Sequence, residues 1–141
     1  MNAIPPRFVI LRHTPGSQGT RGQDALEPVP PHFDWMFEVD GALKTWATEP
    51  LESFQEGVST EVEKLADHRV HYLDFQGDIG GDRGEVRQVI AGHFRTIQSD
   101  TELFVAEITW RDARGQVQSR RVEIAAGYLE LKNGSASAAS P

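Results

Sequence analysis

The chain has 141 residues, with 14 Lys or Arg against 21 Asp or Glu, a formal net charge of −7 and no cysteine. This length predicts one domain with a sizeable core, and the absence of cysteine excludes disulfides and thiolate metal sites. The negative charge argues against a protein that holds a nucleic-acid backbone along a track, because such binding depends on Lys and Arg.

The first predicted strand covers about Arg7–Arg12, after a short leader that contains two prolines. Residues 14–31 hold three glycines and four prolines without apolar periodicity, which predicts a long loop. Phe33–Val39 and Leu43–Thr48 are predicted to pair as a hairpin around Asp40-Gly41. Glycine supplies the positive φ that the tight turn of such a hairpin requires.

The second half of the chain is also predicted to be mainly strands. A helix is expected only at about Ser59–Ala66, Val70–Phe75 is expected as a separate strand, and Gly77–Gly84 as a glycine-rich connection. The further strands are predicted at Glu85–Ile90, His93–Gln98, Leu103–Arg111 and Gln118–Ala125. Short strands at this spacing predict an all-β fold, a small antiparallel barrel with long loops and at most one short helix. We expect one domain over residues 1–132 and a disordered tail over residues 133–141.

A His-x-Asp pair opens the hairpin. On a strand, His32 and Asp34 project to one face while Phe33 and Trp35 project to the other. An imidazole and a carboxylate on one face can share a divalent metal ion or bind a phosphate ester. With five His and 21 acidic residues in the chain, such a pair also arises by chance. The pair alone therefore does not indicate a site, and the interpretation depends on the sequence around it.

Three blocks of sequence, taken in order, resemble the 3′-phosphoesterase domain at the N-terminus of many bacterial DNA ligase D proteins and related free-standing proteins. These blocks are Phe8–His13, His32–Ala47 and Asp67–Gly77. The second block looks like the family's His-Tyr-Asp-Phe-Arg stretch, its Asp-Gly turn and its Lys-Ser-Trp-Ala strand. The third has an Asp-His…Tyr…Asp-Phe-x-Gly run, and the resemblance extends from about Arg7 to about Phe94.

The resemblance implies a metal site in which His13, His32 and Asp34 bind one divalent ion within the closed sheet. Mn²⁺ is the ion that the family implies, and Zn²⁺ or another divalent metal is the alternative, because the ligands are imidazoles and a carboxylate. Three protein ligands would leave positions open for water and a phosphate oxygen. In the family the two histidines lie close together in sequence, whereas eighteen residues separate them here.

The resemblance also implies an activity in DNA repair, the removal of a terminal ribonucleotide or a 3′-phosphate. His68 and Tyr72 occupy the positions of the family's catalytic His and Tyr. The imidazole would protonate the leaving oxygen or stabilise developing charge, and the phenol would donate a hydrogen bond to a phosphoryl oxygen. The implied partners are DNA 3′ ends and a DNA ligase or polymerase, bound by a monomer that needs no membrane.

The chain departs from the family's pattern at several positions. Met36 replaces an arginine that would bind the phosphate, Leu11 replaces a glutamine, and Ala66 replaces an acidic residue. We expect Arg83, in the glycine-rich loop, to take over phosphate binding, since a glycine loop lets backbone and guanidinium approach an anion together.

These departures leave other functions open. Met36 and Ala66 favour a binding module that keeps the fold and the metal but lacks turnover, and recruits a repair partner or recognises a phosphorylated end. A phosphoesterase acting on small-molecule esters is a third possibility, which the acidic surface permits. Because the chain shows no signal peptide and no apolar run that could span a bilayer, we expect a cytoplasmic protein.

Overall fold

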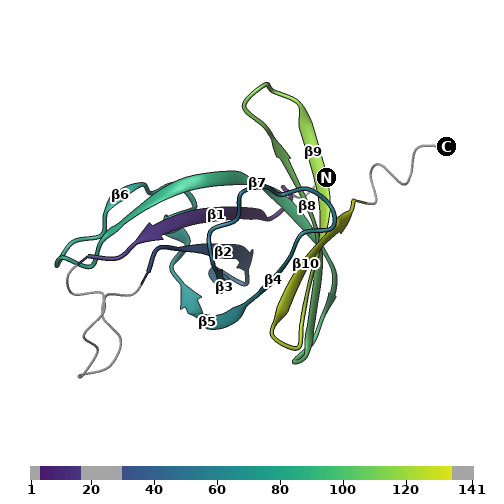
Figure 1. The fold of residues 1–141 in the computed structure, drawn as a ribbon, viewed down its shortest axis with the longest axis horizontal. Coiled ribbons are helices and arrows are strands. Elements are labelled where there is room, and N and C mark those ends of the chain that lie inside the picture. Colours follow the sequence, from purple (N-terminus) through teal and green to yellow (C-terminus); the bar gives the residue numbers. More distant parts are fainter. Residues whose placement is uncertain (1–3, 17–29, 135–141) are drawn as a thin grey trace.

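The computed structural model describes residues 4–16 and 30–134. Among these residues, ten antiparallel strands form one sheet, and the one helical segment is a short 3₁₀ helix, η1 (Val70–Leu73) (Figure 1). The strands are β1 (Arg7–Thr14), β2 (His32–Val39), β3 (Ala42–Thr48), β4 (Ser59–Glu61), β5 (Glu63–His68), β6 (Gly77–Asp78), β7 (Glu85–Ser99), β8 (Leu103–Arg111), β9 (Val117–Ala125) and β10 (Tyr128–Asn133). The all-β prediction is confirmed. The same ranges contain no helix with the length and apolar character needed to cross a bilayer.

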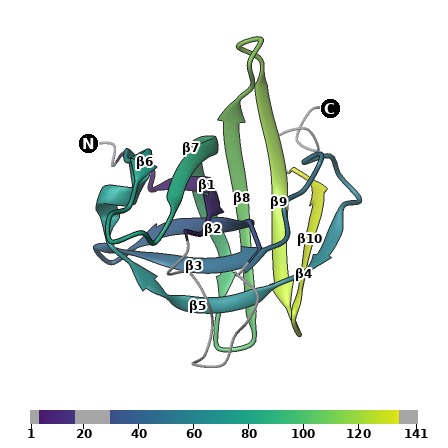
Figure 2. The same cartoon turned by 60° about the vertical axis from the view of Figure 1, so that its left-hand side comes forward.

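The sheet curls into a roll but does not close into the predicted barrel. Its strand order is β4-β10-β9-β8-β7-β1-β2-β3-β5, with β6 paired to β7 outside this path. The two end strands, β4 and β5, follow each other directly in the chain and are separated by Val62 alone. Figure 2 shows β4 running on into β5, so the two strands lie end to end. Strands in this arrangement cannot share a ladder of hydrogen bonds, and the sheet stays open between them.

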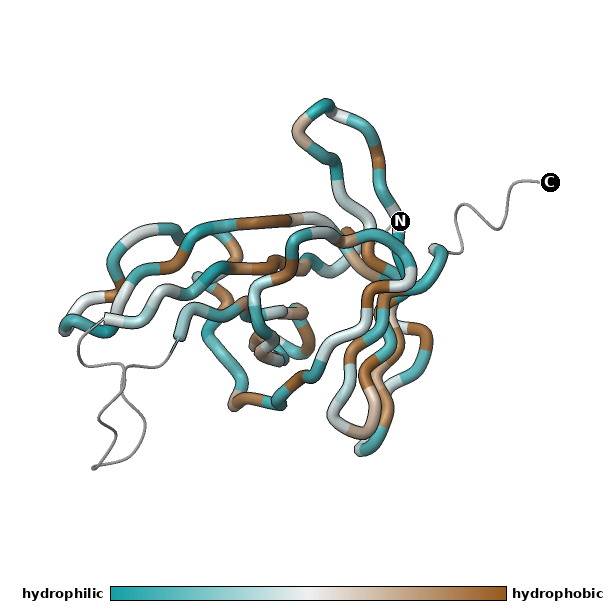
Figure 3. The backbone as a smooth tube through the Cα atoms, in the orientation of Figure 1, coloured by the Kyte–Doolittle hydropathy of each residue, from teal (hydrophilic) through white to brown (hydrophobic). Residues whose placement is uncertain are grey.

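The inner face of the roll holds the larger hydrophobic core. Alternation along β2 sends Phe33, Trp35 and Phe37 into this core, where they meet residues from β1, β3 and β7 to β10. Trp35 is fully buried, and its indole N–H donates to the Thr48 hydroxyl at 3.0 Å. Burying an aromatic side chain of this kind contributes about 1.5–3 kcal/mol. By contrast, the turn that joins β8 to β9 projects from the roll and is mostly hydrophilic (Figure 3).

The outer face of β1, β2 and β3 is covered as well. A smaller cluster packs there beneath η1 and consists of Val9, Leu11, Met36, Leu43, Leu73 and Val86. The central strands therefore have two buried faces, which explains why β2 reads almost continuously buried from Phe33 to Phe37.

Two of the predicted elements are wrong. The helix expected at Ser59–Ala66 is replaced by β4 and β5, because Val58 and Val62, whose spacing imitates a helix, pack on the inner core from an extended chain. The strand expected at Val70–Phe75 is replaced by η1, a single turn that buries Leu73 against the outer face. In both cases tertiary packing overrides local preference.

Other boundaries differ from the prediction. The expected break at Ala91-Gly92 lies inside β7, which runs unbroken, and a side chain at Gly92 would collide with the carbonyl of Thr109 on β8. This glycine therefore permits close backbone approach. Strand β10, which ends at Asn133, was not predicted. Most of the predicted 14–31 loop and 133–141 tail, residues 17–29 and 135–141, lies outside the described residues.

Candidate metal centre

The pairing of β1 with β2 brings the three predicted metal ligands together. In the antiparallel register His13 lies opposite His32, and Leu11 lies opposite Asp34. One potential ligand atom from each of His13, His32 and Asp34 lies within 4.8 Å of the other two. The eighteen-residue separation in sequence is thus bridged by a single step across the sheet, since directly opposite side chains are close neighbours.

The site lies on the outer face of the sheet, which corrects the expectation of a cation inside a closed barrel. Asp34 and Met36 share one face of β2, and Met36 belongs to the outer cluster beneath η1. Trp35, between them, points into the inner core. The aromatic residues of β2 fill the roll, so the polar residues that alternate with them must face outward.

The hydrogen bond of His32 fixes which of its nitrogens faces the carboxylate. Its Nδ1 lies 3.3 Å from the carbonyl oxygen of Pro30, and in the tautomer that carries the proton on Nδ1 this nitrogen donates to that oxygen. The other nitrogen, Nε2, lies 3.1 Å from Oδ1 of Asp34. An unprotonated Nε2 directs its lone pair toward this oxygen.

His13 repeats this arrangement with its two nitrogens exchanged. Its Nε2 lies 3.3 Å from the carbonyl oxygen of Arg83, and its Nδ1 lies 3.8 Å from Oδ2 of Asp34. A backbone carbonyl therefore holds the outer nitrogen of each imidazole and turns the inner nitrogen toward the carboxylate. Metal-binding histidines are held in this way in most proteins, because the outer contact fixes the tautomer and the orientation of the ring.

Asp34 is the buried centre of the group. The residue is 3 % exposed, and its Oδ1 is buried and accepts no hydrogen bond from any described residue. Nε2 of His32 lies 3.1 Å from this oxygen, and when Nε2 carries no proton the two lone pairs that face each other repel. A proton on the imidazole or a cation between the three side chains removes this repulsion. A divalent cation satisfies all three at once, so the residues fit a metal ion.

A pocket of about 170 Å³ lies beside the three ligands. It contains every predicted site residue except His32, which contacts Asp34 directly. The residues that line it are His13, Asp34, Met36, His68, Tyr72, Ile79, Arg83 and Val86.

No family model and no curated protein matches the chain.

His68 and Tyr72 reach the pocket from different elements. His68 ends β5 and Tyr72 lies in η1, with the ring centroids 5.8 Å apart in an edge-to-face contact. Nδ1 of His68 lies 2.9 Å from the carbonyl oxygen of Ala66, so this nitrogen carries the proton in the neutral ring. Nε2 is then the nitrogen that remains for chemistry.

Arg83 lines the pocket and also holds its own loop in shape. Its Nε donates to the carbonyl of Gly80 at 2.9 Å, and its Nη2 donates to the carbonyl of Ile79 at 3.0 Å. Through its own carbonyl it receives the hydrogen bond of His13. Met36, 1 % exposed, supplies an apolar surface where the phosphoesterase family has a cation.

Several contributors to the site were not predicted. The carbonyls of Pro30 and Ala66 orient two histidines, and Ile79 and Val86 form apolar walls. Any residue type can supply a backbone carbonyl, so the sequence carries no signal for the first pair. Val86 belongs to the outer cluster and Ile79 packs against it, which can be seen only once the fold is known.

Proposed function

We propose that this protein is a metal-dependent phosphoesterase that acts at the 3′ ends of DNA and removes a terminal ribonucleotide or a 3′-phosphate. The observation that carries the proposal is the convergence of His13, His32 and Asp34 beside a small pocket that also contains His68 and Tyr72. The resemblance of the sequence to the 3′-phosphoesterase domain of DNA ligase D supplies the substrate class.

His13, His32 and Asp34 would hold the ion, Mn²⁺ in this proposal with Zn²⁺ as the alternative, because two imidazoles and a carboxylate suit either metal. When bound, the ion would supply positive charge that polarises a phosphoryl oxygen and lowers the pKa of a bound water. The backbone carbonyls behind both histidines keep their ligand nitrogens aimed at the carboxylate.

The neighbouring side chains would handle the proton and the charge of the reaction. Nδ1 of His68 is held by the Ala66 carbonyl, so protonation at Nε2 makes the ring an acid for the leaving oxygen. The Tyr72 hydroxyl would donate a hydrogen bond to a phosphoryl oxygen, and donors placed where charge develops stabilise the transition state by several kcal/mol.

The size of the pocket supports a substrate that enters only by its end. At about 170 Å³ it is smaller than the roughly 300–1,000 Å³ of sites that enclose a small molecule. It suits a phosphoryl group, with the remainder of the strand outside. End-specific contact also agrees with a chain of net charge −7, because it requires few phosphate contacts.

Metal binding is tested by thermal melting with and without Mn²⁺. At a free concentration of one hundred times Kd, we expect stabilisation by about 2.7 kcal/mol, which the H32A variant should lose. H93A is the matched control, since His93 is exposed on β7. Melting curves that Mn²⁺ leaves unchanged would contradict the metal site.

Turnover is tested with a 3′-phosphorylated primer and Mn²⁺, by measuring phosphate release, beside a small aryl phosphodiester. Release from the primer in preference to the small ester, lost in H68A, supports the proposed reaction. Preference for the small ester would point instead to a small-molecule phosphoesterase.

The second candidate function is a module that binds a phosphorylated end without cleaving it. Met36 favours this function, because it places an apolar side chain in the pocket where the family has an arginine. Its signature is retained Mn²⁺ stabilisation and retained primer binding with no release of phosphate at high protein concentration.

A further inference from the structure

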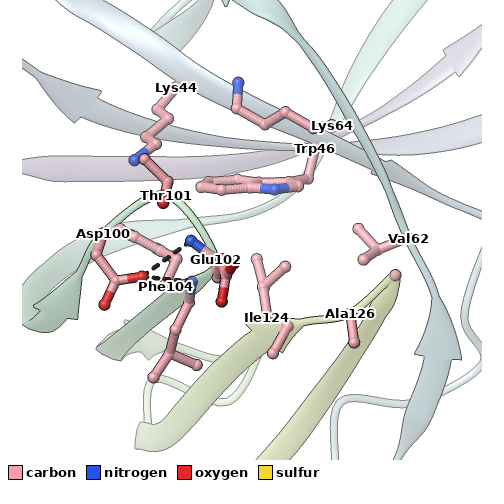
Figure 4. A pocket seen from close by; sticks show the side chains of 13 residues that line it. Lys44, Trp46, Val62, Lys64, Asp100, Thr101, Glu102, Phe104, Ile124 and Ala126 are labelled. Carbon is pink, nitrogen blue, oxygen red and sulfur yellow. Dashed lines mark hydrogen bonds between the residues drawn. The ribbon is translucent and has the colours of Figure 1, made fainter.

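A second pocket lies at one mouth of the roll, on the face of β3 opposite the metal centre. Its volume is about 400 Å³, and its residues come from β3, β5, β8, β9, the β4–β5 junction and the turns that follow β7 and β9 (Figure 4). Trp46 and Phe104, with ring centroids 4.8 Å apart, form an aromatic wall, and Val62 and Ile124 add aliphatic surface. An apolar cavity of this volume with a few polar groups is typical of small-molecule sites.

Two lysine ammonium groups share the aromatic wall. Nζ of Lys44 lies 5.5 Å and Nζ of Lys64 lies 5.1 Å from the ring centroid of Trp46, and Lys44 lies 5.2 Å from that of Phe104. Each cation–π contact contributes about 0.5–1 kcal/mol at an exposed site. Two like charges held over one ring repel each other, and an anion that contacts both relieves this repulsion.

Two carboxylates, Asp100 and Glu102, also line the pocket, but neither forms an ion pair with Lys44 or Lys64. Asp100 accepts hydrogen bonds from the backbone N–H groups of Glu102 and Leu103, each at 2.9 Å, and so closes its own turn (Figure 4). Lys64 is exposed, and its Nζ donates to the carbonyl of Leu65 at 2.6 Å. It also lies 3.7 Å from Asp67, an ion pair of the kind that contributes little. Lys44 has even less ion pairing than Lys64.

Lys44 is half-buried, and its hydrogen-bond partner among the described residues is the Ser99 hydroxyl, at 3.3 Å. None of the described carboxylates forms an ion pair with this ammonium group. A hydroxyl accepts a hydrogen bond but brings no negative charge. A half-buried cation without a counter-ion, at the rim of an apolar cavity, is suited to an anion with an apolar body.

We propose that this pocket binds a nucleoside phosphomonoester, with the phosphate at Lys44 and Lys64 and the base against the wall that Trp46 provides. A phosphomonoester carries about −1.5 to −2 charges at neutral pH, which matches two ammonium groups, whereas a carboxylate brings only one. Thr101 and Glu102, at the rim, supply oxygen atoms that can accept hydrogen bonds from the N–H groups of a base. The ligand is either a free mononucleotide or the phosphorylated terminus of a strand.

The experiment is isothermal titration of the full chain with AMP in EDTA, which removes any contribution of the metal centre. We expect AMP to bind, adenosine and inorganic phosphate to bind at least about tenfold more weakly, and K44M to weaken AMP by a similar factor. K44R keeps the charge and should keep most of the affinity. K132M is the matched control, because Lys132 is an exposed lysine on β10 that pairs with Glu123 at 2.9 Å.

A parallel titration with a 5′-phosphorylated oligonucleotide identifies whether the pocket prefers a free mononucleotide or the phosphorylated terminus of a strand. Tighter binding of AMP assigns the site to a free nucleotide, and tighter binding of the oligonucleotide assigns it to a strand end. The proposal is overturned if AMP fails to bind at millimolar concentration, or if K132M weakens it as much as K44M does. Loss of AMP binding in H32A, with an unchanged circular dichroism spectrum, would also overturn it by placing AMP at the metal centre.

Discussion

Asp34 shows how a single buried oxygen determines what a site can bind. The carboxylate lies between two imidazoles whose outer nitrogens are both held by backbone carbonyls, so the inner nitrogens can only face it. Without a cation, and without a proton on Nε2 of His32, this arrangement is unfavourable, since an unsatisfied buried polar atom costs about 1–3 kcal/mol. If His13, His32 and Asp34 bind a metal ion as proposed, its binding would remove this cost and raise the stability of the fold.

Replacing this carboxylate by its amide tests that reasoning. In D34N the side-chain NH₂ can donate to Nε2 of His32, so we expect the metal-free variant to be more stable than the wild type, by about 1–3 kcal/mol. The same change should abolish stabilisation by Mn²⁺. Denaturant unfolding in EDTA measures the stability of the metal-free variant, and unfolding in Mn²⁺ measures the stabilisation by the metal. A metal-free variant less stable than the wild type would indicate that His32 is protonated and ion-paired instead.

Much of the site could be predicted from residue types and a family resemblance. His13, His32 and Asp34 were named as a group although they are distant in sequence, and the structure brings them together. Which face of the sheet carries these three residues could not be predicted, because alternation along a strand separates two faces without showing which one faces the core. The substrate-binding role of Arg83 stays a prediction, since its guanidinium also supports its own loop.

At the scale of elements, two tight turns depend on an aspartate that accepts backbone hydrogen bonds. Asp100 begins the turn after β7 and accepts from the N–H groups of Glu102 and Leu103. Asp112 accepts from the N–H groups of Arg114 and Gln116 in the turn between β8 and β9. The hydrogen bond from the backbone of Glu102, followed by that from Gln98, lowers the pKa of Asp100. The side chain of Gln118 is the main cause that lowers the pKa of Asp112.

These lowered pKa values predict a stability that depends on pH. Because each carboxyl has a lower pKa in the folded chain than in the unfolded one, its contribution is full above the ordinary value of 3.8 and declines as pH falls toward the folded pKa. We expect Tm to decrease below about pH 5, and the decrease to be smaller in D100N/D112N.

Thermal melts between pH 3 and pH 6 measure this effect. E52Q serves as the control, because Glu52 is exposed and its side chain makes no hydrogen bond among the described residues. An equal loss of Tm at low pH in wild type and double variant would show that other carboxyls dominate acid unfolding.

The elements with strong local signals were predicted well, and those set by tertiary contacts were not. The hairpin of β2 and β3 has alternating hydrophobic residues and an Asp-Gly turn, and Asp40 and Gly41 adopt the positive φ values expected there. Strand β8 matches its predicted bounds, Leu103–Arg111. Strand β10 escaped prediction because only Leu129 and Leu131 are buried among charged neighbours, a pattern too short to distinguish from a tail.

On the scale of the whole molecule, the two candidate sites lie on opposite faces of one sheet. The inner face holds the main core and, at one mouth, the pocket beside Trp46. The outer face holds the candidate metal centre. β3 contributes to both, since Trp46 and Leu43 belong to opposite clusters. Ligands of the two sites would therefore approach from different directions and would not compete for space.

The open seam between β4 and β5 gives a prediction about association. Edge strands offer unpaired amides and carbonyls to other chains, and charged side chains discourage such pairing. Both strands carry exposed charges, at Glu61, Glu63, Lys64 and Asp67. We expect E63T/D67T to associate with increasing concentration, measured by light scattering. The control is E123T/E130T, on strands that have neighbours on both sides. Equal behaviour of the two variants would show that these charges do not protect the edge.

The position of the open seam also affects how the protein avoids self-association. Most open sheets have two borders in unrelated parts of the chain, each needing its own protection against self-association. Here both ends of the main strand order fall within residues 59–68, one after the other, and only β6 forms a further edge among the described residues. A single short, highly charged stretch can therefore protect both ends of the main strand order.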